Sequence, residues 1–216
     1  MMKYNTIFYY SDIDNAYVTS VPRLPGCMSD GKTIEEAIRN THRVIDEWVQ
    51  DAMDDGEPIP EEDEKVLISS NCTVDDVAGY ILNKTGPITA MMLEKLTYYT
   101  LAWSLAWYEK PLFAEPFQAW RNGPVCPKLY ETHKGKKVVS NQQFPHNHQF
   151  TNSEMKIIDA VLVAYGDYDA EQLSQLTHRE DPWMLTRGEL DDSERSHRMI
   201  PYKLLKGYYG QIVTEV

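Results

Sequence analysis

The acidic segment Asp51–Glu64 divides the sequence into two parts with different residue patterns. Eight of its fourteen residues are acidic, none is basic, and glycine and proline residues interrupt any regular element there. Strand-like runs dominate before it and helix-like runs dominate after it. We therefore expect two domains, residues 1–69 and 70–216, with an α+β fold overall. The acidic segment itself has two interpretations, a solvated helix end with a linker, or a surface that docks on a basic partner.

The first part has the pattern of a small β-β-α-β module. Residues 3–10 and 16–21 are rich in β-branched and aromatic side chains and enclose turn residues, which predicts a β-hairpin. Thr33, followed three residues later by Glu36, has the spacing of a helix capping box. Apolar residues then recur at helical spacing as far as Ala52. Residues 65–69 are predicted to return as a further strand.

Three short motifs in this part carry a resemblance to a known family. They are Leu24-Pro25-Gly26-Cys27, then Gly31 with the helix start at residues 33–37, and Gly56-Glu57-Pro58-Ile59-Pro60. With them, residues 3–68 resemble the N-terminal domain of HicB antitoxins. The resemblance implies a partial RNase-H-like fold without nuclease activity that binds and blocks a small toxin. HicB antitoxins usually continue into a DNA-binding tail, and no such pattern follows here, so direct DNA binding is not expected.

The second part is predicted to be a compact domain of five or six helices. Capping residues open most of them, and glycine or proline ends several. The expected helices run from Thr73 to Lys84, from Thr89 to Pro111, from Thr151 to Tyr165, from Asp169 to Thr177 and from Pro201 to Tyr209, with a short one over Lys128–Lys134. Outside that short helix, residues 112–150 carry no clear pattern.

This part also resembles a known family. The motifs are Met92–Tyr99, Pro111–Phe113, Glu115–Tyr130 and Leu173–His178 followed by Pro182-Trp183. With them, residues 73–209 are similar to the Panacea domain of SocA-like antitoxins and GepA-like prophage proteins. The resemblance implies neutralisation of toxins by direct contact, and SocA is implied to deliver its toxin to a protease as well. Asn122 departs from the family pattern, in which a tyrosine is expected.

Aromatic and charged residues of this domain are the candidates for contact with a toxin. Trp and Arg are frequent interface anchors, which favours the run from Trp120 to Val125. The alternative is a buried Trp120 that fixes a turn. The aromatic residues Tyr98, Tyr99, Trp103, Trp107 and Tyr108 are most simply part of the core, and their excess predicts that some are exposed as a partner surface. The candidate toxin-binding residues are Tyr99, Trp103, Trp120, Arg121, Asn122, Gly123, Pro124, Val125, His178 and Trp183.

Other reactive residues do not complete a catalytic or metal-binding pattern. His178 beside Glu180 and Asp181 has the composition of an acid–base group, but a helix end is the preferred interpretation. Cys126 and His178 lack an oxyanion-hole motif, and His146-Asn147-His148 lacks a third metal ligand. Lys134-Gly135-Lys136-Lys137 is interpreted as a solvated turn or as a contact for phosphate or RNA. We expect no catalytic residue, metal or cofactor.

Charge and cysteine content narrow the classes of partner and location. The chain carries 33 acidic and 21 basic residues, a formal net charge of −12. This charge argues against a general nucleic-acid binder and favours a basic protein partner. The sequence has no apolar run long enough to cross a membrane, no signal-peptide core, and three widely spaced cysteines rather than a disulfide framework. We therefore expect a cytoplasmic protein.

Together these features predict a type II antitoxin that neutralises a cognate toxin by direct binding, the toxin acting on translation or RNA. The alternatives are an adaptor that delivers a toxin to an ATP-dependent protease and a regulator associated with prophage or defence. An enzyme using Cys126 or His178 is disfavoured, because the sequence shows no complete nucleophile, phosphate-loop or metal motif. The sequence leaves open the identity of the toxin, the domain that binds it, homodimer formation and transcriptional autoregulation.

Overall fold

The structure is a computed structural model that describes residues 4–60, 71–144, 148–191 and 193–214. The described residues form two compact units. One contains residues 4–60 and 211–214, and the other contains residues 71–210. The first unit combines a small sheet with one long helix, and the second is mainly helical, so the expected α+β class is confirmed.

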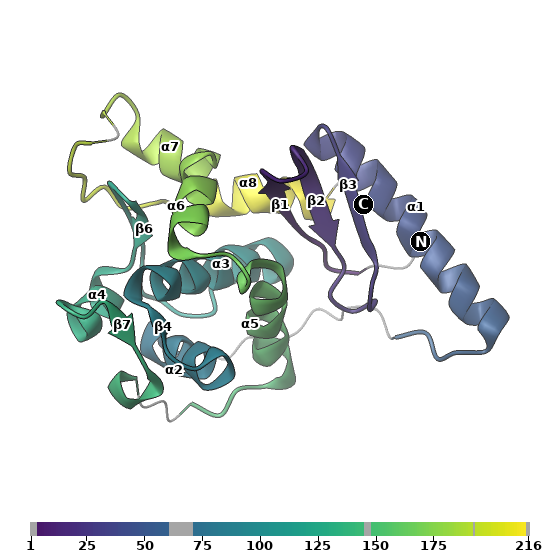
Figure 1. Ribbon diagram of the computed structural model, residues 1–216, viewed down its shortest axis with the longest axis horizontal. Coiled ribbons are helices and arrows are strands. Elements are labelled where there is room, and N and C mark those ends of the chain that lie inside the picture. The colour runs from purple at the N-terminus through teal and green to yellow at the C-terminus, as the bar shows by residue number, and fades with distance from the viewer. Residues whose placement is uncertain (1–3, 61–70, 145–147, 192, 215–216) are drawn as a thin grey trace. The chain divides into compact units, whose positions relative to one another are not determined.

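The first unit contains a three-stranded antiparallel sheet in the order β1-β2-β3 (Figure 1). β1 (Ile7–Ser11) and β2 (Ala16–Ser20) pair across the predicted hairpin. β3 (Met28–Gly31) was not predicted, because Met-Ser-Asp-Gly has little strand propensity; it pairs with β2 because the preceding turn folds the chain back. The strand expected at residues 65–69 lies outside the described residues.

Helix α1 (Ile34–Asp55) packs on the sheet and begins at the predicted cap. The Thr33 hydroxyl accepts a hydrogen bond from the Glu36 backbone N–H at 3.2 Å. The Glu36 carboxylate accepts from the backbone N–H of Lys32 at 2.8 Å, one residue before the position that a capping box requires. Gly31 is needed here because a Cβ at this position would lie 2.3 Å from the Ala37 nitrogen.

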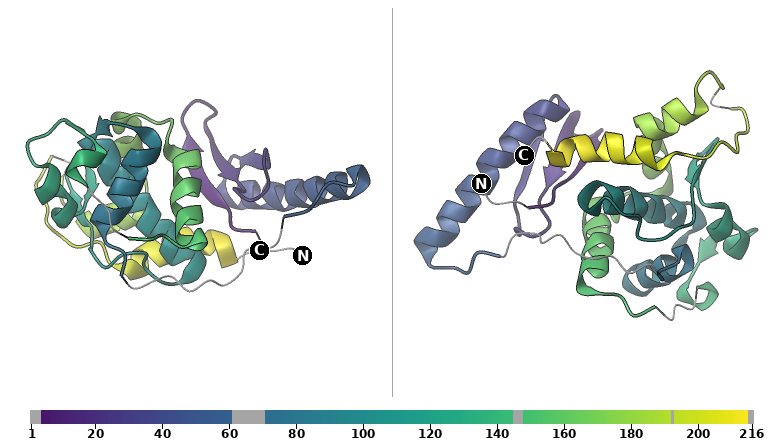
Figure 2. Two further views of the ribbon diagram at one scale, coloured as in Figure 1. Left: turned by 90° about the horizontal axis from the view of Figure 1, so that it is seen from below. Right: turned by 180° about the vertical axis from the view of Figure 1, so that it is seen from behind.

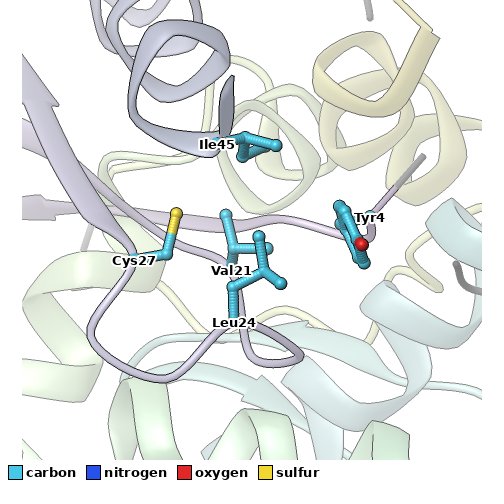
Figure 3. Packing of buried hydrophobic residues seen from close by; sticks show 5 residues of the cluster. All are labelled: Tyr4, Val21, Leu24, Cys27 and Ile45. Atoms are coloured by element: carbon cyan, nitrogen blue, oxygen red, sulfur yellow. The ribbon is translucent and has the colours of Figure 1, made fainter. Parts of the chain in front are cut away.

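The core of this unit explains the first HicB-like motif. Val21, Leu24, Cys27, Ile45 and Tyr4 form one buried cluster, drawn in Figure 3. Three backbone hydrogen bonds among Val21, Leu24 and Cys27 close the turn that carries these side chains inward. The Trp48 indole on α1 donates to the Pro25 carbonyl at 3.1 Å. The motif therefore forms a turn that fastens the strands to the helix.

The second unit contains the predicted helices together with elements that were not predicted. The capping boxes at Thr73, Thr151 and Asp169 are present. The helices are α2 (Val74–Thr85), α3 (Ala90–Tyr108), α4 (Pro127–His133), α5 (Asn152–Tyr165), α6 (Ala170–His178), α7 (Asp181–Arg187) and α8 (Tyr202–Thr214), with the 3-10 turn η1 (Asn141–Gln143). Of α8, the residues up to Gly210 belong to this unit. Two short ribbons pair β4 (Ile88–Thr89) with β7 (Val138–Val139) and β5 (Gln118–Trp120) with β6 (Gly123–Val125). Helix α7 and both ribbons were not predicted.

Helix α3 is the centre of this unit. It contacts α2, α4, α5 and α6 as well as β6, and Figures 1 and 2 show it between its neighbours. One inward face was predicted, whereas the helix is buried around its whole circumference between Leu93 and Ala106. Tyr99 stacks on Tyr165 with ring centroids 4.0 Å apart, and the Trp103 indole donates to the Tyr165 hydroxyl at 3.1 Å. These aromatic side chains make the core.

A buried carboxyl group joins this aromatic core. Glu180, between α6 and α7, accepts hydrogen bonds from the hydroxyls of Tyr99 at 3.2 Å and Tyr209 at 2.6 Å. Burial raises the pKa of Glu180 to about 8, and the two tyrosine hydrogen bonds oppose that rise. Glu180 is 6% exposed, and its hydrogen bonds to two core tyrosines make it part of the packing between α3, α6 and α8.

Candidate partner-binding site

The hairpin of β5 and β6 presents the two most exposed residues of the predicted contact run. Arg121 and Asn122 occupy its turn and are exposed, whereas Gly123, Pro124 and Val125 are buried. Trp120 is half-buried, its ring lies edge-on to Tyr130 at 5.0 Å, and its indole donates to Gln118 at 2.8 Å. Trp120 thus both fixes the turn and leaves part of its ring accessible, which combines the two alternatives considered from the sequence.

Hydrogen bonds to backbone atoms hold this hairpin in place. The Trp183 indole donates to the Trp120 carbonyl at 2.9 Å, and the Ser174 hydroxyl donates to the Asn122 carbonyl at 3.0 Å. The Lys95 ammonium donates to the Pro124 carbonyl at 3.0 Å. Gly123 has φ +97°, and a Cβ there would lie 2.7 Å from Lys95 Cε. The turn is therefore rigid and leaves the side chains of Arg121 and Asn122 uninvolved in these contacts.

Two other predicted contact residues form a stacked pair behind the hairpin. The rings of His178 and Trp183 stack with centroids 4.0 Å apart, and the Arg187 guanidinium lies 4.9 Å from the Trp183 ring centroid. His178 is the last residue of α6, as predicted, and Trp183 is 3% exposed. Arg187 is 1% exposed and donates to the Ala119 carbonyl at 3.2 Å. Trp183 therefore supports the site from within.

Tyr99 and Trp103 do not reach this surface. Both are fully buried in the core around α3, so neither side chain contacts a partner on the surface of this fold. The alternating aromatic pattern of α3 suggested that some of these rings are exposed. Tyr98, Tyr99 and Trp103 are buried because α3 is enclosed by helices and by β6, whereas Trp107 and Tyr108 at its end are partly exposed.

A pocket of about 810 Å³ adjoins the hairpin turn. Its lining is rich in cations and aromatic rings, although the chain as a whole carries a net charge of −12. The cationic residues are Lys95, Arg121, Lys136, Lys137 and Arg195, the aromatic ones are Trp120, Tyr130, His133 and His197, and Glu94 is the single carboxylate in the lining. The Lys134–Lys137 run is visible in the sequence, but the sequence does not predict that Lys136 and Lys137 line the same pocket as Arg121.

Buried charges line part of this pocket. Glu94 accepts from His133 Nε2 at 2.7 Å and from the Cys126 backbone N–H at 2.8 Å. Burial raises the pKa of Glu94, and the hydrogen bond from His133 opposes the rise. Burial lowers the pKa of Lys95 to about 8, and the charge of Glu94 opposes the fall. Glu94 and Lys95 are consecutive residues of α3. From the sequence they were noted only as part of the Panacea motif.

Of the other reactive residues, Cys126 is buried and His148 is paired with a carboxylate. Cys126 is fully buried, and burial raises the pKa of its thiol to about 12, whereas a nucleophilic cysteine needs a lowered pKa. His146 lies outside the described residues. The Nε2 atom of His148 lies 3.0 Å from Oε2 of Glu154, which is in the first turn of α5. Among the described residues, no three side chains of His, Cys, Asp or Glu are placed to hold a metal ion.

Comparison with known protein families finds two matches in the same order as the two parts of the sequence, and the first match extends past the expected boundary at residues 69 and 70 as far as Leu82. Residues 5–82 match the sequence model described as HicB_like antitoxin of bacterial toxin-antitoxin system. Residues 93–184 match the one described as Antitoxin SocA-like, Panacea domain. The chain thus carries a HicB-like antitoxin domain followed by a SocA-like Panacea domain. The hairpin of β5 and β6 lies inside the Panacea match, as does the predicted contact run.

Three curated proteins are similar to part of the chain. A UPF0150 protein of Thermoplasma acidophilum is 41% identical over 59 residues, which are 27% of this chain and 84% of the relative. A UPF0150 protein of Synechocystis is 36% identical over 58 residues, 27% of this chain and 73% of the relative. An uncharacterised protein from the rep-hol intergenic region of Haemophilus phage HP1 is 38% identical over 48 residues, 22% of this chain and 36% of the relative.

Both matched families are antitoxins, which favours a binding function over catalysis. One of the similar proteins is encoded by a phage. Among the described residues, no helix is both long and apolar enough to span a lipid bilayer.

Proposed function

We propose that this chain is the antitoxin of a type II pair and neutralises a cognate toxin by direct contact through the Panacea domain. The observation that carries this proposal is the hairpin turn, whose backbone is fixed by Trp183, Ser174 and Lys95. A rigid turn exposes Arg121 and Asn122 at little cost in conformational entropy on binding. Arginine is among the residues that most often dominate the energy of an interface.

The acidic end of α1 supports an electrostatic contribution to the encounter. Asp51, Asp54 and Asp55 are exposed in its last two turns, and the last turn holds no basic residue. Carboxylates at a helix C-terminus oppose the helix dipole, so they reduce the stability of α1. Their presence is consistent with attraction of a basic toxin, as expected for one that acts on RNA or the ribosome. Residues 61–64 of the acidic segment lie outside the described residues.

The test is neutralisation of the protein encoded by the neighbouring open reading frame. Cells that express this toxin should be rescued by the 216-residue chain, and rescue should fail with Arg121→Ala. Loss of one anchor weakens binding by about 2 kcal/mol, or about 30-fold in affinity. Lys156→Ala removes an exposed cation on α5, away from the turn, and serves as the matched control. Full rescue by a folded Arg121→Ala variant would contradict the assignment to this turn.

A second variant tests the HicB-like domain in the same rescue assay. Ile13 is 91% exposed in the turn between β1 and β2, so Ile13→Ser leaves the core intact. Loss of rescue with Ile13→Ser and not with Arg121→Ala would assign the toxin to the HicB-like domain. The toxin level in the rescued cells separates binding from delivery to a protease. Binding leaves the level unchanged, whereas an adaptor lowers it in cells that contain the protease.

A further inference from the structure

We propose that the pocket beside the hairpin turn of the Panacea domain binds a nucleotide. The pocket of about 810 Å³ has the size of a small-molecule site. Its walls combine the two kinds of side chain that a nucleotide requires. Cations hold the phosphates through charge-assisted hydrogen bonds, and an aromatic ring stacks on the base.

The charge of the pocket opposes the charge of the chain. Five cationic side chains line it against the single carboxylate of Glu94, whereas the chain has 33 acidic and 21 basic residues. Glu94 is already engaged by His133 and by the Cys126 N–H. Helix α3 also begins at the pocket, with Ala90 and Met91 in the lining, and the N-terminal end of a helix carries partial positive charge. The pocket therefore attracts an anion.

Lys95 distinguishes this site from a surface patch of solvated lysines. It is 1% exposed, and its Nζ donates one hydrogen bond, to the Pro124 carbonyl. Among the described residues, no carboxylate lies within ion-pair distance of this ammonium, and it has two further N–H donors. A buried cation without a paired anion is costly unless a ligand supplies the charge. A phosphate in the pocket supplies it.

The aromatic part of the lining favours a base over a plain anion. The ring of Trp120 is partly accessible, and it packs edge-on to Tyr130 at 5.0 Å and to His197 at 5.6 Å. These contacts hold the indole in a fixed orientation. The Trp120 side chain therefore loses little conformational entropy when a base stacks on it. A run of aspartate and glutamate residues has the charge for this pocket but no ring to stack on Trp120. The nucleotide accounts for both kinds of side chain.

The experiment measures binding to the full-length purified chain by isothermal titration calorimetry, with ATP, GTP, adenosine and tripolyphosphate as probes. ATP or GTP should bind more tightly than tripolyphosphate, and adenosine should bind weakest. The double variant Lys136→Gln/Lys137→Gln should weaken ATP binding at least about tenfold. Both lysines are exposed, so this variant keeps its fold. Lys156→Gln/Lys203→Gln removes the same charge from exposed positions outside the pocket and should leave affinity unchanged.

A second variant tests the stacking. Trp120→Leu should weaken ATP binding about tenfold while tripolyphosphate binding stays the same, with circular dichroism as the check on folding. Equal loss in the pocket and control double variants would show nonspecific attraction and overturn the proposal. So would ATP binding no tighter than tripolyphosphate, or displacement of ATP by hexaglutamate at equal concentration. None of these measurements uses a toxin, so their failure leaves the antitoxin proposal standing.

Discussion

The buried Glu180 carboxyl should make the stability of the Panacea domain depend on pH. Its pKa is raised from 4.5 to about 8 by burial, so the folded state holds the proton more tightly than the unfolded state. Stability from this group is therefore complete below about pH 4.5 and is lost as the pH rises toward 8. Each unit of pH in that window corresponds to about 1.4 kcal/mol. Between pH 5.5 and 7.5 the loss is about 2.7 kcal/mol.

The variant Glu180→Gln should remove this slope. Glutamine stays neutral at every pH, and its amide accepts from one tyrosine hydroxyl and donates to the other, so the contacts with Tyr99 and Tyr209 are kept. The free energy of unfolding is measured by urea titration at pH 5.5, 6.5 and 7.5. Tryptophan fluorescence reports mainly on the unfolding of the second unit, which contains Glu180, because four of the five tryptophans lie in residues 71–210.

The comparison of two variants makes this test decisive. Glu189→Gln removes an exposed carboxylate and should follow the wild-type pH dependence. The difference in unfolding free energy between wild type and Glu180→Gln should change by about 2.7 kcal/mol over the two pH units. Parallel curves for wild type and Glu180→Gln would refute the claim that this carboxyl is neutral in the folded protein.

Three further changes test other parts of the structure. Gly123→Ala should lower stability by about 1–3 kcal/mol in urea titration, because φ is +97° and Lys95 occupies the space of a Cβ; an unchanged midpoint would contradict the described turn. Trp183→Ala should cost about 3–5 kcal/mol of stability and should weaken toxin binding only in proportion to unfolding; a folded variant with lost affinity would place Trp183 in the interface. Asp51→Asn/Asp55→Asn should raise the melting temperature, since the helix dipole opposes both charges, and should slow association with the toxin at low salt. Glu35→Gln at the opposite end of α1 should lower the melting temperature instead.

The sequence predicted the elements that have local signals. Capping residues such as Thr73, Thr151 and Asp169 determine helix starts through contacts within three residues, so they can be read without the fold. The β1–β2 hairpin likewise depends on neighbouring residues. β3 and the β5–β6 ribbon have no such signal. β3 pairs only because the turn over Leu24–Cys27 returns it to β2, and the short ribbon depends on contacts with α3 and α6.

The candidate site was predicted in part for the same reason. Arg121 and Asn122 stand in a recognisable motif, and the structure exposes both. The sequence pattern favours a core position for Tyr99 and Trp103, but it does not show how many neighbours enclose α3, so it could not exclude them as contact residues. The pocket joins residues that are up to 108 positions apart, from Thr89 to His197. Only the fold brings them together.

The anchoring of the hairpin through its backbone has a consequence for evolution and engineering. The hydrogen bonds that hold the turn are accepted by backbone carbonyls, those of Ala119, Trp120, Asn122 and Pro124. These backbone atoms are present whatever the side chain. Residues 121 and 122 are therefore free to vary without a penalty in folding. Specificity for a new toxin becomes accessible by one or two substitutions on an unchanged frame, and a library randomised at these two positions should consist largely of folded proteins.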